Sequence, residues 1–156
     1  MRSTDQPDLF NLPRFIQAQD PVFTWVQEEL SAGQKRRHWM WFIFPQMAGL
    51  GGSEMSRYFA IQSRDEAEAY LKHPQLGARL RTCTQLVLNI KDRSIADIFG
   101  HPDDLKFHSS MTLFAQIAAE DNPFNQALEQ YFYGMVDEVT LSLLDSKQPQ
   151  LPTDQR

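Results

Sequence analysis

Residues His38–Ser56 read HWMWFIFPQMAGLGGSEMS, and this stretch decides most about the fold. The seven residues from His38 to Phe44 are aromatic, apolar or both, and Pro45-Gln46 and a glycine-rich loop follow directly. Bulky aromatic residues dominate protein cores, and glycines let a backbone approach a ligand closely. The stretch therefore predicts either a pocket wall with a backbone lip or a core segment with a tight turn.

The aromatic block is compatible with two secondary structures. It is short and does not alternate between apolar and polar residues, so its periodicity separates neither helix nor strand. We expect a short buried helix that ends before Pro45, because a proline disfavours the α conformation in the residue ahead of it. A short buried strand at 39–44 is the alternative.

The remaining chain carries helix signals. The clearest is an apolar stripe with spacings of four, three, four and three residues, formed by Leu76, Leu80, Cys83, Val87 and Ile90. Helix starts are indicated by capping residues and prolines at Asp20-Pro21, at Ser63 with Glu66, at Ser94, and at Asp121 or Asn122 with Pro123. The sequence predicts a mainly α fold, a single compact domain of about seven short helices over residues 11–144. Residues 1–10 are expected to be loose and residues 145–156 to form a disordered tail.

Composition and charge narrow the function classes. The chain has 156 residues and a net charge of −5, yet residues 35–93 hold ten Lys/Arg and five Asp/Glu. The acidic total argues against non-specific binding to duplex nucleic acid, which needs a broad basic face, whereas the basic middle can hold a small anion. The longest apolar run, residues 39–45, is far too short to span a membrane.

Cysteine and histidine usage indicates neither disulfides nor a metal. Cys83 is the single cysteine and lies within an apolar helical stripe, so we interpret it as a core residue in a protein of the reducing cytoplasm. The four histidines have no metal-ligand spacing, and no P-loop, dinucleotide fingerprint, nucleophile elbow or zinc-protease pair occurs. No metal and no cofactor are expected, and no pattern specifies an enzyme class or an oligomeric state.

The loop of residues 48–56 is the first candidate site. Its glycines permit close approach of the backbone, the helix expected after it offers free N–H groups, and Ser53 and Arg57 add a hydroxyl and a charge. Such groups bind a phosphate or a carboxylate. The alternative is a connecting loop with a capping serine.

Residues 104–112, DLKFHSSMT, form the second candidate site. On a helix Lys106, Ser109 and Ser110 share one side, at i, i+3 and i+4. Hydroxyls beside a lysine suit hydrogen bonding to a phosphate or a sugar. The alternative is an exposed helix face.

The third group is His38, Trp39, Trp41 and Gln46. Indole faces stack on heterocycles, and a histidine can act as a general acid or base near neutral pH. The alternative is that these side chains are satisfied within the core.

Three strings, HWMWFIFPQ, YFAIQSRDEAEAYLKHPQLGARL and DDLKFHSSMTLF, resemble the bacterial and fungal family catalogued as domain of unknown function 1810. The resemblance covers residues 12–144 and implies a small, mainly helical cytoplasmic protein. It brings no established activity and no catalytic residues. Some relatives carry the label calpastatin, which fits poorly because inhibitors of that type are long, polar and disordered, unlike this aromatic-rich chain.

A more distant resemblance is to the NADAR-type N-glycosidases, which act on nucleotides related to ADP-ribose or to the riboflavin pathway. The order of an aromatic segment, a small-residue loop and a later Lys106–Phe114 helix is similar, and Glu54 would match a loop acid. The chain departs from that family in lacking a clear C-terminal Trp-Gly signature.

Two functions follow as hypotheses. In the first, the protein binds or hydrolyses a nucleotide-like or ADP-ribose-like small molecule. Trp39 or Trp41 would stack the base, and Ser53, Arg57 and Lys106 would hold phosphate or ribose. Glu54 or His38 would activate water for cleavage of a glycosidic bond. In the second, the protein is a noncatalytic interaction module that docks through its aromatic block. The expected partner of the first is a small anionic ligand, and neither nucleic acid nor a membrane is expected.

Overall fold

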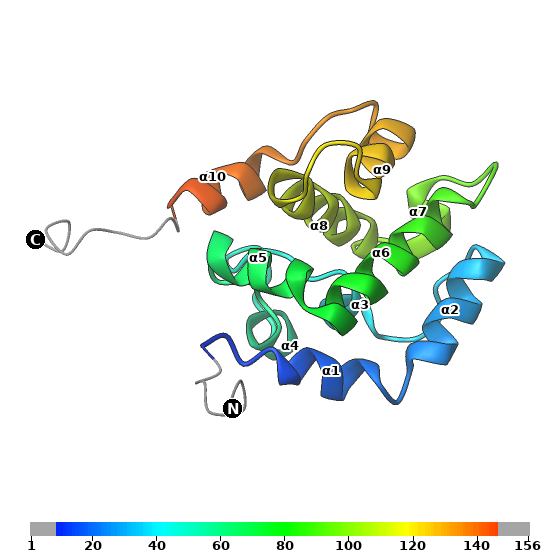
Figure 1. Cartoon of the computed structure of the whole chain (residues 1–156). Coiled ribbons are helices and arrows are strands. Elements are labelled where there is room, and N and C mark those ends of the chain that lie inside the picture. Colours follow the sequence, from blue (N-terminus) through cyan, green and yellow to red (C-terminus); the bar gives the residue numbers. More distant parts are fainter. Residues whose placement is uncertain (1–8, 147–156) are drawn as a thin grey trace, which may run out of the picture.

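The computed structural model describes residues 9–146, which fold into ten helices (Figure 1). The helices are α1 Pro13–Gln19, α2 Phe23–Ala32, α3 Met40–Ile43, α4 Glu54–Tyr58, α5 Arg64–Lys72, α6 Pro74–Leu88, α7 Ile95–Phe99, α8 Asp103–Ile117, α9 Pro123–Phe132 and α10 Glu138–Ser146. The mainly helical, single-domain prediction is confirmed. The predicted number of about seven helices was too low. The difference lies in α3, α4 and α7, which are helices of only one turn or slightly more.

The aromatic block forms α3 and not a strand, so the strand alternative at 39–44 is wrong. The amide of Ile43 donates to the carbonyl of Trp39 at 3.2 Å, and that of Phe44 to the carbonyl of Met40 at 3.1 Å. Within residues 9–146 the single β-type contact is an isolated parallel bridge between Met47 and Ile61, just after the block. Pro45 ends the helical turn as expected.

Side-chain caps begin most of the helices that the sequence predicted. The hydroxyls of Ser53, Ser63 and Ser94 accept hydrogen bonds from the backbone amides of Ser56, Glu66 and Asp97, respectively. The side chain of Asn122 accepts a hydrogen bond from the amide of Asn125. Asp20 does not cap α2, which starts at Phe23 after Val22; its carboxylate instead lies 2.8 Å from the guanidinium of Arg79.

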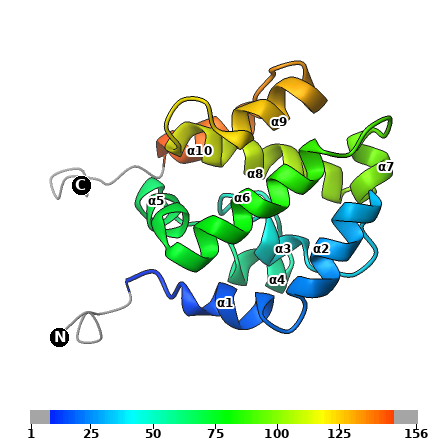
Figure 2. The same cartoon turned by 45° about the vertical axis from the view of Figure 1, so that its right-hand side comes forward.

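Helix α6 crosses the centre of the molecule, with α1 and α2 on one side and α8 and α9 on the other (Figures 1 and 2). Four residues of its predicted stripe are buried: Leu76, Leu80, Cys83 and Val87 are at most 1% exposed. The fifth, Ile90, follows the end of α6 and is half-buried. Such a helix is stabilised mainly by burying its apolar stripe against the helices around it.

Aromatic rings fill the space between α3, α7 and α8. Phe44 packs edge-to-face on Phe107 with ring centroids 5.1 Å apart, and Phe99 stacks on Phe107 at 4.8 Å. Such pairs contribute about 0.5–1.5 kcal/mol each beyond their buried area. The core therefore fixes α3 and α8 relative to each other. It thereby also fixes the loop that follows α3 relative to the first turns of α8.

A buried carboxylate anchors the segment that leads into α3. Glu29, whose side chain is 4% exposed, accepts the amides of Arg36 and Arg37, the guanidinium of Arg37 and the indole N–H of Trp39. Burial raises the pKa of this carboxyl, but these hydrogen bonds outweigh burial and lower the pKa to about 2.

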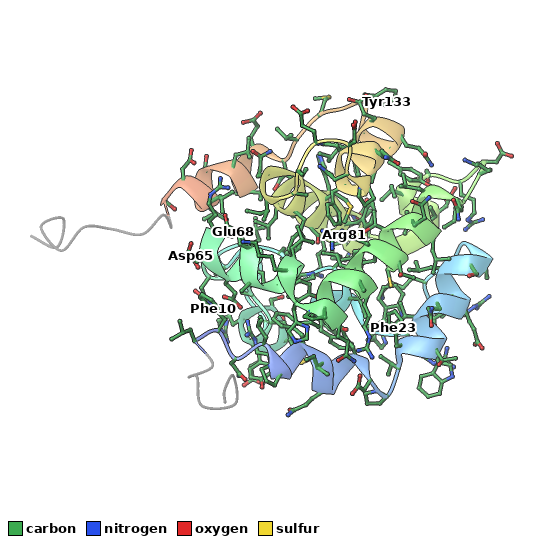
Figure 3. All side chains as sticks on the ribbon, viewed as in Figure 1. Phe10, Phe23, Asp65, Glu68, Arg81 and Tyr133 are labelled. Carbon is green, nitrogen blue, oxygen red and sulfur yellow. The ribbon has the colours of Figure 1, made fainter. Side chains whose placement is uncertain are left out.

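The helices of the described residues begin at Pro13 and end at Ser146. Helix α10 extends to Ser146, two residues into the segment predicted as a tail. At the end of α9 Tyr133 adopts a left-handed conformation with φ of 57° and lies on the outside of the molecule (Figure 3). Residues 1–8 and 147–156, to which the predictions of loose and disordered ends mostly apply, lie outside the described residues.

Candidate functional site

The loop that follows α3 and the start of α8 face each other across a cavity of about 470 Å³. The loop and α4 contribute Gln46, Leu50, Gly51, Gly52, Ser53 and Ser56. The α8 side contributes Pro102, Leu105, Lys106, His108 and Ser109, and the start of α10 adds Asp137 and Val139. Two polar segments that are distant in sequence therefore meet in one concave surface.

The loop wall is held by backbone pairing and by close packing at a glycine. Ala48 donates to the carbonyl of Ile61 at 2.8 Å, and Ile61 donates to the carbonyl of Gln46 at 2.9 Å. A Cβ atom on Gly51 would lie 2.4 Å from Ser56 Oγ, far inside contact distance, whereas a Cβ on Gly52 would meet nothing within 4 Å. Gly51 is thus required for the shape of this wall.

Gln46 is the most unusual polar residue of the cavity. It is 9% exposed, and its side-chain amide has no hydrogen-bond partner among residues 9–146. A Cβ on Gly51 would lie 3.5 Å from Gln46 Nε2, so this amide lies beside the glycine lip. A carboxamide offers two N–H donors and an acceptor, so this side chain can pair with the polar edge of a ligand.

The positive charge of the cavity is compensated. Lys106 Nζ lies 3.2 Å from Asp103 Oδ1, and the other oxygen of Asp103 lies 2.8 Å from Lys35 Nζ. Asp137, next to α8 at the start of α10, adds a second carboxylate. Lys35, Lys106, Asp103 and Asp137 together carry no net charge.

Asp137 is held at the start of α10 by one of its two oxygens. Its Oδ2 accepts from the amide and hydroxyl of Thr140 and lies 3.2 Å from Ser109 Oγ. No residue among 9–146 donates a hydrogen bond to Oδ1. Asp137 therefore caps α10 and keeps one carboxylate oxygen as a free acceptor at the cavity.

His108 and two apolar side chains complete the lining. His108 Nε2 lies 2.8 Å from the carbonyl oxygen of Met135, which only accepts, so Nε2 carries the proton. The imidazole stacks on Phe132 with ring centroids 4.0 Å apart and an interplanar angle of 8°. Leu105 and Val139 are each 55% exposed and form an apolar rim.

Of the residues singled out in the sequence, the structure brings Gln46, Ser53, Lys106 and Ser109 to the cavity. Ser53 caps α4 and also donates to Ser56 Oγ at 3.0 Å. Ser109 is buried and lies 3.1 Å from the carbonyl of Leu105, one turn earlier in α8.

The two indoles lie elsewhere. Trp39 is 1% exposed, and its Nε1–H donates to Glu29 Oε1 at 2.8 Å, so it is a satisfied core residue. Trp41 is half-buried and packs against the hydrophobic core. Neither lines the cavity, and its walls contain no indole.

The charged candidates are also separate from it. His38 is exposed ahead of α3, and Glu54 is exposed in the first turn of α4. Arg57 is exposed and donates to the carbonyl of Gly52. None of the three lines the cavity.

Ser110 is buried within α8, next to Ser109, but does not line the cavity. Its hydroxyl has no hydrogen-bond partner among the described residues. Its buried position therefore gives Ser110 no contact with the cavity and no function in this site.

Asp137 and the apolar rim were not recognised from the sequence. Asp137 caps α10, and nothing in its local sequence indicates a second role. His108 lay inside the second candidate segment, but its stacking on Phe132 depends on the packing of α8 against α9.

The single cysteine, Cys83, lies in the core and does not line the cavity. Burial raises the pKa of the Cys83 thiol to about 12, as for an inert core cysteine. Residues 9–146 contain no group of three His, Cys, Asp or Glu side chains placed to hold a metal ion. No helix in this range has the length and apolar character needed to cross a membrane.

The crystal structure of the conserved hypothetical protein Rv1873 from Mycobacterium tuberculosis is similar to this structure, with 51% sequence identity and a TM-score of 0.87. The match covers 88% of this chain and 99% of that one. No curated protein matches this chain. The model of the family described as protein of unknown function DUF1810 matches residues 9–144, and the chain belongs to that family.

Proposed function

We propose that this protein binds a small, nucleotide-like molecule in the cavity between the 46–56 loop and α8. The observation that carries the proposal is the convergence of the two polar segments around a cavity of about 470 Å³, whose loop wall includes Gln46 with a side-chain amide that has no partner among residues 9–146. Ligand cavities typically measure roughly 300–1,000 Å³ and combine apolar walls with a few convergent polar groups. The apolar rim and polar lining described above match that pattern.

Binding is favoured over hydrolysis by the position of the acids. An N-glycosidase needs a carboxylate at the scissile bond, and Glu54 is exposed and does not line the cavity. Asp137 does line the cavity, but one of its oxygens is occupied by the cap of α10. We therefore propose a binding protein, and any cleavage activity would be assigned to Asp137 rather than to Glu54.

Binding is also favoured over docking through the aromatic block. That alternative requires both indoles at the surface in a contiguous apolar patch. Trp39 is 1% exposed and bonded to Glu29, so the block cannot present both.

The test is a thermal-shift screen with nucleobases, nucleosides, nucleotides, ADP-ribose, NAD and flavin nucleotides at millimolar concentration. A ligand at ten times its Kd stabilises the folded state by about 1.4 kcal/mol. For a chain of this size that raises Tm by about 3–6 °C.

A matched pair of substitutions localises any binding to the cavity. Gly51→Ala displaces Ser56 and should abolish the shift, whereas Gln126→Ala, on the exposed face of α9 and outside the cavity, should preserve it. A screen in which no compound raises Tm, or equal effects of both substitutions on the shift, would contradict the proposal.

A further inference from the structure

The polar and charged groups that line the cavity favour some nucleotide-like molecules over others. Resting on the proposed function, we propose that its ligand is an uncharged nucleoside, whose base edge pairs with Gln46 and whose sugar hydroxyls bind Asp137. The proposal excludes nucleoside diphosphates and ADP-ribose as preferred ligands.

Gln46 supplies the first argument. The residue is nine-tenths buried and lines the cavity, and its side-chain amide has no hydrogen-bond partner among residues 9–146. A glutamine amide pairs in a bidentate manner with a group that presents a donor and an acceptor side by side, as the edges of nucleobases do. A phosphate has only acceptors and would leave the carbonyl oxygen of Gln46 unsatisfied.

Charge supplies the second argument. Lys106 is paired with Asp103, which also pairs with Lys35, and Asp137 faces the same cavity. No cation of the lining is left without a carboxylate, so a phosphate dianion gains no uncompensated charge and is repelled by Asp137. An uncharged ligand avoids this repulsion.

Asp137 supplies the third argument. Its Oδ1 accepts no hydrogen bond from the described residues, while Oδ2 is fully engaged. A carboxylate oxygen is a strong acceptor for hydroxyl groups and has no donor capacity when ionised. The sugar of a nucleoside offers such donors, and Leu105 and Val139 offer apolar contact to the base or sugar ring.

The experiment compares matched ligand series by isothermal titration calorimetry on the full chain. The probes are uridine, cytidine, adenosine and guanosine, each with its 5′-monophosphate and 5′-diphosphate, together with ADP-ribose. We expect at least one nucleoside to bind at least tenfold more tightly than its own diphosphate, with little dependence on salt.

Substitutions connect that preference to Gln46. Gln46→Glu keeps the shape of the side chain but replaces its donor group by an acceptor, and should weaken nucleoside binding at least tenfold. Gln126→Glu makes the same change on the exposed face of α9 and should leave binding unchanged. The Tm of both variants shows whether they remain folded, and Gln46→Leu provides a second, uncharged loss of the amide.

The outcomes separate the two proposals. A tenfold preference for a nucleoside that is lost in Gln46→Glu and Gln46→Leu supports the inference. Tighter binding of a diphosphate or ADP-ribose, or nucleoside binding that survives both substitutions, overturns it while the binding function stands. If neither these compounds nor the wider screen binds, both proposals fall.

Discussion

Removing the negative charge of Glu29 should destabilise the protein at neutral pH and have almost no effect at pH 2. Its pKa is lowered from 4.5 to about 2 in the folded protein. Each pKa unit corresponds to about 1.36 kcal/mol, so the ionised carboxylate stabilises the fold by up to about 3 kcal/mol relative to its protonated form. Glu29→Gln resembles the protonated form and should cost about that amount at pH 7.

The sign of the pH dependence follows from the direction of the shift. A depressed carboxyl pKa contributes stability that is fully present above the unfolded value of about 4.5 and is lost as pH falls through about 2. The difference in free energy of unfolding between wild type and Glu29→Gln should therefore shrink steadily between pH 5 and pH 2.

The hydrogen bonds to Glu29 are unequal. Arg37 is half-exposed, so its ion pair with Glu29 contributes only about 0.2–1 kcal/mol. The amides of Arg36 and Arg37 and the indole of Trp39 all donate to Oε1 and carry the larger share. Arg37→Met should accordingly cost much less than Glu29→Gln.

Urea unfolding followed by tryptophan fluorescence measures these free energies, since Trp39 itself contacts the carboxylate. Glu28→Gln is the matched control, one residue earlier in α2 and exposed. Parallel pH profiles for wild type and Glu29→Gln from pH 5 to pH 2.5 would refute the assignment of this stability to Glu29.

Three further predictions test the packing around the site. Gly51→Ala should destabilise the fold by about 1–3 kcal/mol because its Cβ overlaps Ser56, while Gly52→Ala should be close to neutral; equal melting temperatures for the two variants would contradict this. Ser110→Ala should stabilise the fold by about 1 kcal/mol, since it removes a buried hydroxyl without a partner and improves helix propensity; a loss of stability in urea unfolding would show that the hydroxyl is satisfied. Cys83, fully buried with a pKa raised to about 12, should react with a thiol reagent at pH 8 only after unfolding in urea; rapid labelling of the native protein would contradict its placement in the core.

Much of the fold was accessible from local signals. Ser53, Ser63 and Ser94 cap helices as predicted, because a cap is a bond between a side chain and an amide three residues later. Of the two candidates ahead of Pro123, Asp121 and Asn122, it is Asn122 that caps α9. The apolar stripe of α6 was readable for a similar reason, since one helix face repeats every three or four residues. Periodicity did not distinguish helix from strand at α3, because the aromatic block has no apolar repeat. There the helix was favoured only because Pro45 follows the block.

The site was accessible only in part. The sequence indicated the glycine loop and the lysine-serine segment, because glycine freedom and hydroxyl grouping are properties of neighbouring residues. It also favoured Trp39 as a stacking surface on residue type alone. Trp39 instead lies in the core because Glu29, ten residues earlier, accepts its N–H.

The sequence by itself determined the mainly helical domain, most of its helix starts and membership of one family, since these depend on residues within a turn or two of each other or on similarity along the chain. Only the tertiary structure decided that the 46–56 loop faces α8, and that Asp137 enters the cavity from the start of α10. Packing of the aromatic core between α3 and α8 sets that juxtaposition, and it depends on contacts between residues far apart in the chain. Such contacts leave no spacing in the sequence from which a pocket or its charge balance can be read.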